Sequence, residues 1–310
     1  MAGDDPRRDA KEAGIPIPRR IPFTFPDELD PRWHPRDPEF AAMVNGASLT
    51  MPYLEPFLIR TLREVVQQLD DPRLVEYGRA FNAQEQCHYQ THRRFNDLLK
   101  ARRYPELVAV EQQMAASYVR LSQRSLRTRM AYTAGFESMT AGVTQFLVDR
   151  RVALFGGADA RVASFVLWHF VEETEHKCVA YDVYQAAFGG SLSGYLARMI
   201  GVFHGSLDVM VYSMKGYRHV LRRDGLWNNL RSRLHLARRL GQFCWYVLPR
   251  MVCAALPGHD PRHVKDPQWV RDWIAGYAQA HPDSVPLVDT RDPLMPVPFP
   301  VSESTLEIAT

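Results

Sequence analysis

Residues 168–184 read WHFVEETEHKCVAYDVY, a stretch of helix-forming residues in which Glu173 and His176 stand three positions apart. On a helix this spacing places the carboxylate and the imidazole on one face, about one turn apart. The same spacing recurs earlier in the chain, where Glu85 and His88 belong to the stretch EQCHYQTH. Each pair predicts one side of a metal-binding site.

Two further glutamates stand in apolar or small-residue surroundings on other long helical stretches. Glu55 belongs to MPYLEPFLI and Glu137 to AYTAGFESMTAG. A lone charge buried there would cost several kcal/mol, and a bound cation would remove that cost. The order Glu, Glu-x-x-His, Glu, Glu-x-x-His on four successive helices is the arrangement of di-iron carboxylate proteins, and its short, long and short intervals fit two hairpins joined by a crossover. The pattern predicts two metal ions held by Glu55, Glu85, His88, Glu137, Glu173 and His176.

The run VEETEH leaves a choice of carboxylate on the last of these helices. Glu172 could pair with His176 at a spacing of four, but Glu173 reproduces the spacing of the earlier pair and is therefore assigned as the ligand. Gln84 and Glu172 then occupy matching places, each directly before a ligand glutamate. From there each could hold a ligand histidine of a neighbouring helix through its second ring nitrogen, although Gln84 also suits a solvated position. Glu175 is expected on the outer face.

Other side chains near the set are candidates with a weaker signal. His169 and His92 each lie four positions from a ligand, and we expect either an additional metal ligand, favoured more for His169, or a core histidine bonded to a carboxylate. Cys87 and Cys178 are expected to be buried thiols, because a carboxylate-rich set is hard and oxygen-donating. His204 stands on a later helix, where it could line a pocket, but no spacing ties it to the set.

Apolar positions recur three and four apart from about residue 39 to 280, and alternating β-branched runs are almost absent. This pattern predicts an all-α protein, a ferritin-like four-helix bundle with additional C-terminal helices. Capping residues, prolines and glycines place helices at about 50–70, 71–103, 106–123, 125–155, 159–188, 192–223, 227–255 and 266–280. We expect three segments, an extended or disordered N-terminal arm at 1–38, the helical domain with its extension at 39–280, and a Pro-rich tail at 281–310.

Composition narrows the functional classes. The 310-residue chain has a formal net charge of +3 and no long run of Lys and Arg, so nucleic acid is not an expected partner. Its four cysteines form no Cys-x-x-Cys pair and its N-terminus lacks the apolar stretch of a secretory signal, which together favour the cytoplasm. Residues 195–214 and 241–257 are apolar but interrupted by charges or proline, so neither predicts a membrane span. The stretch RSRLHLARRLGQFCWYVLPRM, residues 231–251, could instead make a peripheral contact with a membrane surface.

With these residues laid out, the chain resembles the ferritin-like family known as predicted metal-dependent hydrolases. The likeness lies in PFTFPDELDPRWHPRDPEF at residues 22–40, around Glu55, in EQCHYQTH, in WHFVEETEHKCVAYDVY and in LPGHDPRHVKD at residues 256–266. The stretch EETEHK is also similar to that of di-iron N-oxygenases that act on aminoaryl groups. The first resemblance implies hydrolysis and the second implies oxygen chemistry.

Three functions are compatible with these observations. We expect first an enzyme with two iron ions, manganese, zinc or mixed metals being alternatives, that activates dioxygen to oxidise a small organic substrate with electrons from an external donor. The second is a two-metal hydrolase. The third is a ferritin-like protein that binds metal without catalysis, for which a bundle with no substrate pocket would be the sign. A homodimer is expected in each case.

Overall fold

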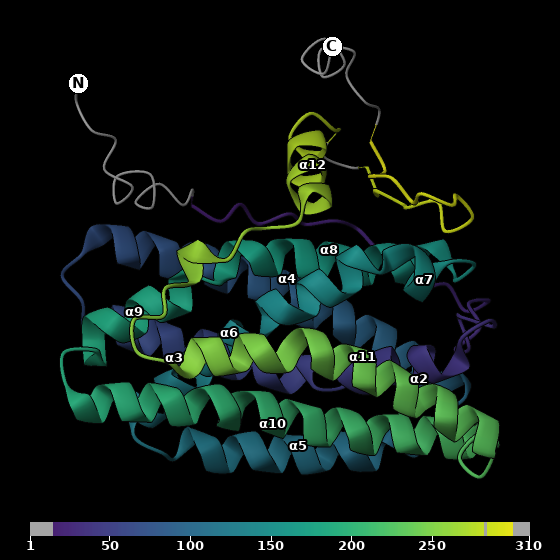
Figure 1. Ribbon diagram of the computed structural model, residues 1–310, viewed down its shortest axis with the longest axis horizontal. Helices are drawn as coiled ribbons and strands as arrows, with labels where there is room; N and C mark the ends of the chain where they lie inside the picture. Colours follow the sequence, from purple (N-terminus) through teal and green to yellow (C-terminus); the bar gives the residue numbers. More distant parts are fainter. Residues whose placement is uncertain (1–14, 282–283, 300–310) are drawn as a thin grey trace.

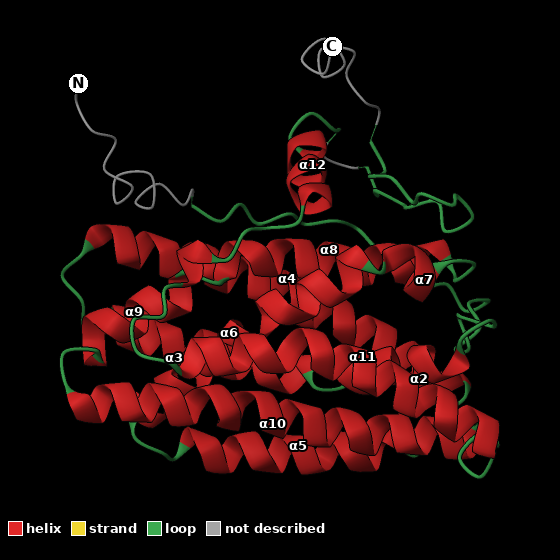
Figure 2. Cartoon of the chain, in the orientation of Figure 1, coloured by secondary structure: helices red, strands yellow, loops and turns green. Residues whose placement is uncertain are grey.

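The computed structural model describes residues 15–281 and 284–299, and this part of the chain is helical with no β-strand (Figures 1 and 2). The prediction of an all-α helical bundle is confirmed. The helices are α2 (Pro38–Ser48), α3 (Met51–Val66), α4 (Pro72–Arg102), α5 (Leu107–Ser122), α6 (Leu126–Asp149), α7 (Arg151–Phe155), α8 (Ala160–His176), α9 (Val179–Phe188), α10 (Leu192–Arg223), α11 (Leu230–Ala255) and α12 (Gln268–Tyr277).

The four helices that carry the predicted glutamates, α3, α4, α6 and α8, pack together with α9. Aspartates fix the starts of two of them. Asp71 accepts a hydrogen bond from the backbone N–H of Arg73 at the start of α4, and Asp159 does the same for Arg161 at the start of α8. Such caps satisfy backbone donors that a helix start leaves unpaired. Both helices therefore begin where the sequence predicts.

Two predicted helices are interrupted in the structure. The helix expected at 159–188 ends at His176 and restarts at Val179, and the helix expected at 125–155 divides at Arg150. Neither break has a glycine or proline, so periodicity alone carries no signal for it. At the first break the ammonium of Lys177 donates to the carbonyl oxygen of Val264 at 2.8 Å and to Asp266 at 2.6 Å. Contacts with a distant segment thus accompany the interruption.

Helix α2 lies inside a region that the sequence analysis left without a helix. Asp37 accepts from the backbone N–H of Phe40 at 3.0 Å, and Pro38 occupies the first helical position. This is the same Asp-Pro start that opens α4. This helix start was not predicted from the sequence, because the many prolines just before it indicated an extended arm.

Helix α10 packs so closely on α6 that the two backbones are in contact. A Cβ built on Gly201 would stand 2.0 Å from the carbonyl oxygen of Ala131, and one on Gly135 would stand 2.1 Å from the carbonyl oxygen of Gly201. Only glycine fits at such a crossing. One face of α10 is therefore fixed on the bundle, and the opposite face is directed outward.

The described part of the N-terminal arm runs along the side of the bundle that α8 occupies (Figure 1). Its apolar side chains Ile21, Phe23 and Trp33 are buried, whereas Ile15 and Ile17 near its start are exposed. The ring of Phe23 lies 5.4 Å from that of Trp168 on α8. Residues 1–14 of the predicted arm, positions 282–283 and the last eleven positions of the tail lie outside the described residues. No helix in the described ranges has both the length and the apolar content needed to cross a bilayer.

Candidate metal centre

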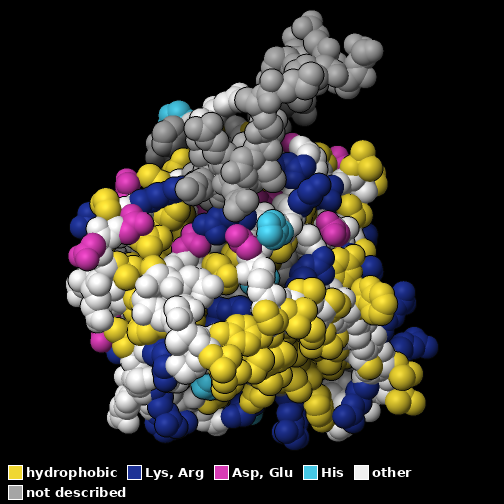
Figure 3. Space-filling view, turned by 60° about the vertical axis from the view of Figure 1, so that its left-hand side comes forward, with side chains coloured by type: hydrophobic (Ala, Val, Ile, Leu, Met, Phe, Trp, Pro, Cys, Tyr) yellow, Lys and Arg dark blue, Asp and Glu magenta, His cyan; other side chains and the backbone are white. Residues whose placement is uncertain are grey.

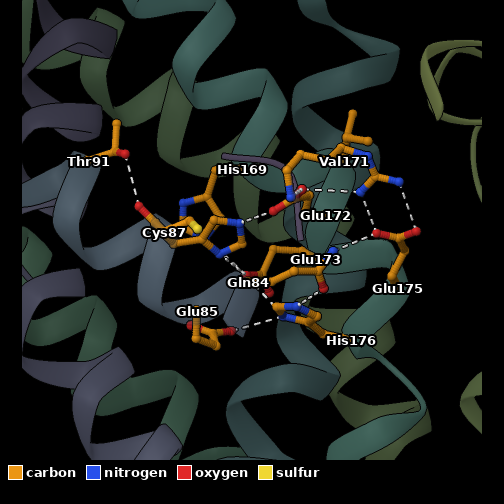
Figure 4. Close-up of polar contacts among 12 residues, drawn as sticks. Gln84, Glu85, Cys87, Thr91, His169, Val171, Glu172, Glu173, Glu175 and His176 are labelled. Atoms are coloured by element: carbon orange, nitrogen blue, oxygen red, sulfur yellow. Dashed lines mark hydrogen bonds and ion pairs between the residues drawn. The ribbon is translucent and has the colours of Figure 1, made fainter. Parts of the chain in front are cut away.

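The structure brings all six predicted ligands together in the interior of the bundle. Glu55 comes from α3, Glu137 from α6, and one Glu-x-x-His pair from each of α4 and α8. All six side chains are at most 1% exposed. Figure 4 shows Glu85, Glu173 and His176 directed toward one another. Residues far apart in sequence thus share one buried cluster.

Most carboxylate oxygens of the cluster have no hydrogen-bond partner. This holds for both oxygens of Glu55, Glu85 and Glu137 and for Oε2 of Glu173. A buried ionised carboxylate without a partner carries a desolvation penalty of several kcal/mol, and four of them repel one another. Cations bound between the oxygens would remove both costs. The donor set therefore fits metal ions.

The cluster offers two positions for metal ions. Nitrogen and oxygen atoms of Glu85, Glu137, Glu173 and His176 all lie within 4.8 Å of one another, and so do those of Glu55, Glu85 and His88. A further group within the same limit contains His88, His169 and Glu173. Glu85 and Glu173 belong to groups on both sides. These two carboxylates therefore lie between the two groups of potential ligands.

Gln84 fixes the ring of His176. The amide nitrogen of Gln84 donates to the carbonyl oxygen of Ile17 at 3.1 Å and to Glu175 at 2.7 Å, so its Oε1 must be the acceptor. Nε2 of His176, 2.6 Å from that oxygen, is then the N–H donor. In the neutral ring Nδ1 carries the lone pair, and it has no hydrogen-bond partner although Oε1 of Glu85 is 2.9 Å away. This nitrogen is available to a metal ion.

Glu172 holds His88 in the matching way. Its Oε1 accepts from Arg19, and its Oε2 lies 2.8 Å from Nε2 of His88. The carboxylate makes Nε2 the donor, which leaves Nδ1 of His88 with a lone pair and without a hydrogen-bond partner. A carboxylate or amide that orients a ligand histidine is a recurrent feature of metal sites.

His169 is oriented by a chain of hydrogen bonds that begins at Asn96. The amide of Asn96 donates to the carbonyl oxygen of Ser48 and its Oδ1 accepts from the Ser48 hydroxyl at 2.6 Å. Ser48 Oγ must then accept from Nδ1 of His92 at 2.8 Å, and Nε2 of His92 accepts from Nδ1 of His169 at 2.6 Å. The remaining nitrogen, Nε2 of His169, lies 3.0 Å from Oε1 of Glu173. A third lone pair is thereby directed at the cluster.

The buried position and mutual proximity of the cluster's carboxylates shift their pKa values. Burial raises the pKa of Glu55 well above its usual value, and the charges of Glu85 and Glu173 raise it further. Burial and the same kind of repulsion also raise the pKa of Glu137. For Glu173 burial acts upward, but the adjacent imidazoles of His169 and His176 outweigh it and lower the pKa well below its usual value. Such perturbed acids are typical of functional sites.

Arg19, on the extended arm, supports both histidines from outside the cluster. Its guanidinium bonds Glu175 at 2.6 Å and Glu172 at 3.2 Å, and it is buried. Glu175 in turn accepts from Gln84, the partner of His176. Burial raises the pKa of Glu172 to about 7, and the positive charge of Arg19 opposes that rise. Glu175 belongs to no group of potential ligands and stays partly exposed, so it lies outside the cluster, where the arm partly covers it.

One apolar cavity adjoins the cluster at His169, and a second lies beyond it. The first, of about 100 Å³, is lined in part by His92, His169 and Phe170. The second, of about 130 Å³, lies farther out between α2, α6, α10 and α11 and includes Phe136 and Met214. Both are lined by Met43, Ala47, Met51, Val143, Phe170 and Phe243. A small apolar ligand therefore has room beside the metal centre.

Several functional side chains carried no readable signal in the sequence. Arg19 stands in a Pro-rich arm, and Ser48 and Asn96 are far from any ligand motif. Their roles emerge only from the packing of the arm and of α2 on the bundle. Cys178 is buried and Cys87 half-buried, and neither belongs to a group of potential ligands among the described residues. His204 is exposed and does not reach the cavities.

The fold and the cluster together define a helical-bundle protein with the buried carboxylates and imidazoles of a metal centre. The chain belongs to the family described as predicted metal-dependent hydrolase, whose model matches residues 17–265. This confirms the resemblance to that family. No curated protein and no solved structure matches the chain.

Proposed function

We propose that this protein is an enzyme with two metal ions bound by Glu55, Glu85, His88, Glu137, Glu173 and His176, with His169 as a seventh ligand. The observation that carries the proposal is the set of buried carboxylate oxygens without partners, facing imidazole nitrogens that hydrogen bonding leaves with free lone pairs. The family description favours hydrolysis, which is the first reading of the activity.

Bound metal ions would polarise a substrate carbonyl or phosphoryl group and lower the pKa of a water molecule, the chemistry that a two-metal hydrolase uses. The residues of this chain would hold that site rigid. Gln84 and Glu172 orient two histidines through their outer nitrogens, and the chain through His92 orients His169. Glu85 and Glu173, shared by the two positions, would keep the metal ions close together.

The cavity beside His169 favours catalysis over metal storage. A protein that only binds metal needs no space for an organic molecule next to it, whereas an enzyme does. The first cavity touches His169, and its wall is formed mainly by apolar side chains such as Met51, Val143 and Phe146. We therefore expect a substrate whose reacting end reaches the metal centre and whose remainder is apolar.

Oxygen activation is the second reading, and two observations favour it. Every potential ligand is a carboxylate or an imidazole, a hard set that suits iron. The cavity at His169 offers few polar groups to a hydrolysable substrate, and oxidation of an apolar compound needs none. Iron at this site would supply redox chemistry, for which an external electron donor is required. The predicted similarity to di-iron N-oxygenases belongs to this reading.

Metal content and oxygen response separate the readings. The protein is expressed with iron, reduced without air, and then exposed to air while its visible absorbance is followed. Oxygen-dependent absorbance changes that Glu137→Ala abolishes would favour oxidation. Zinc, manganese or magnesium, an absence of oxygen response and turnover of ester or phosphoester probes would favour hydrolysis. A protein that binds no metal under any of these conditions would refute both.

A further inference from the structure

The outward face of α10 carries a continuous row of apolar side chains. They are spaced four, four and three residues apart, so they lie along one side of the helix. All are exposed, by 38% to 74%, and the row consists of Leu192, Leu196, Ile200, Phe203, Leu207, Val211 and Met214. The opposite side of the helix is fixed on α6 through Gly201. This row is therefore not part of the core.

Helix α11 adds a second row beside it. Its exposed members are Leu230, Leu234, Trp245, Leu248 and Val252, followed by Leu256 just after the helix, and Trp245 is 79% exposed. The two rows, here called the α10–α11 face, hold thirteen of the twenty large apolar side chains exposed in the described part of the chain. Figure 3 shows a broad apolar area with basic side chains around it. Such a concentration marks an interaction surface.

The charge of this region is strongly one-sided. Between residues 192 and 256 the sequence has ten arginines and lysines and two aspartates, whereas the whole chain has a net charge of only +3. Both aspartates are engaged with neighbouring helices, Asp208 with Tyr132 and Asp224 with Arg103. Arg198 is buried and Arg239 pairs with Asp37, but the other eight basic side chains still outnumber the two aspartates. The face therefore combines apolar rows with net positive charge.

Two partners could cover the α10–α11 face, a second copy of the chain or a membrane surface, and the combination of apolar rows and positive charge favours one of them. A second copy of the chain, docked on the same face about a two-fold axis, would bring two strongly basic hairpins together, and like charges oppose that contact. An anionic lipid surface attracts the arginines and accepts the apolar rows and Trp245 into its interface. We propose that the α10–α11 face binds an anionic membrane surface as a peripheral contact.

The outer cavity borders the same face at Met214. Met214, a member of the α10 row, lines it together with Leu240 and Phe243 of α11. This step rests on the proposed function: the membrane-bound protein would take an acyl chain or another lipid-soluble substrate from the bilayer, and the cavities would lead it toward His169. Membrane binding itself can be measured without any activity, so failure of one idea is distinguishable from failure of the other.

The test is co-sedimentation of the full chain with vesicles of phosphatidylcholine alone and with vesicles containing roughly a third phosphatidylglycerol. We expect binding to the anionic vesicles only, weakened by raised salt. Arg231→Gln with Arg238→Gln should reduce partition by about tenfold or more. Leu207→Gln with Leu248→Gln, which removes apolar side chains from both rows, should also reduce it about tenfold.

Val108→Gln with Val119→Gln is the matched control, because these exposed side chains lie on α5, outside the face. It should bind like the parent protein. Thermal unfolding of each variant shows whether it is folded, which the exposed positions lead us to expect. Equal binding by the parent and the Leu207→Gln, Leu248→Gln variant would overturn the proposal. So would a parent protein that ignores anionic vesicles and sediments as a dimer, while the same variant sediments as a monomer.

Discussion

Arg19 and Glu172 are joined twice, since the backbone N–H of Arg19 and its guanidinium both donate to the same carboxylate oxygen, at 3.1 and 3.2 Å. The second oxygen of Glu172 is left to hold His88. A residue of the extended arm thereby fixes a histidine of the bundle interior. In the proposed metal site, packing of the arm and binding of metal would be coupled through this contact.

Arg19→Met should lower metal affinity by about 10- to 100-fold, the usual effect of removing a group that orients a ligand. It leaves Glu172 buried without its positive partner, so the free energy of unfolding should also fall by about 3 kcal/mol. Metal competition measures the affinity, and the visible spectrum of the cobalt-loaded protein reports the ligand geometry. Arg20→Met is the control, because Arg20 is exposed. An unchanged cobalt spectrum in Arg19→Met would contradict the positioning role.

His169→Ala should weaken one of the two metal positions and leave the other nearly intact. His169 shares one group of potential ligands with His88 and Glu173 and another with Glu55 and His92. Glu137 and His176 belong to neither of these groups. Titration with metal should therefore show one tight and one weakened step. His204→Ala, an exposed histidine on α10, should leave both steps as they are. Two unchanged steps in His169→Ala would exclude it as a ligand.

The sequence predicts most of the helices and the six clustered residues, because helix periodicity, the Glu-x-x-His spacing and the apolar surroundings of Glu55 and Glu137 are all local features. Spacing within one helix places Glu85 with His88, and Glu173 with His176, on shared faces. The position of Arg19 depends on how the arm crosses α8, and the chain from Asn96 to His169 depends on the packing of α2. No periodicity encodes such contacts. The break after His176 could not be predicted either, because the contact partner of Lys177 at the break, Val264, follows α11 in the sequence.

Glu137→Gln should act in opposite directions with and without metal. In the metal-free protein it replaces one of four crowded buried acids by a neutral group of the same shape, so the melting temperature should rise. With metal it removes a ligand, so the stabilisation by metal should shrink from about 4 kcal/mol at a thousandfold excess over Kd. Thermal unfolding with and without chelator measures both effects. A metal-free variant less stable than its parent would show that the carboxylates do not repel.

Gly201→Ala and Gly241→Ala form a matched pair that tests the seating of α10. The methyl group at Gly201 would meet backbone at 2.0 Å, so we expect a loss of about 3 kcal/mol or more. At Gly241, on exposed α11, no atom lies within 4 Å, and alanine should stabilise by about 0.5 to 1 kcal/mol through helix propensity. Denaturant unfolding of both variants measures the difference. Equal effects would mean that α10 does not sit on α6 at this distance.

Val143→Phe tests whether the cavities admit a ligand. Val143 lines both of them, and a phenyl group there would occupy their shared wall. Apolar cavities of about 150 Å³ bind benzene, so a small apolar compound such as toluene should raise the melting temperature of the parent protein. Val143→Phe should abolish that shift, whereas Val143→Ala, which widens the same space, should keep it. Metal content should be unchanged in both, because Val143 lies beyond Glu137 on α6 and contributes no ligand atom. If Val143→Phe loses the toluene shift and keeps its metal, the result would support binding of the apolar part of the substrate in these cavities. If the toluene shift survives in Val143→Phe, the ligand does not bind there.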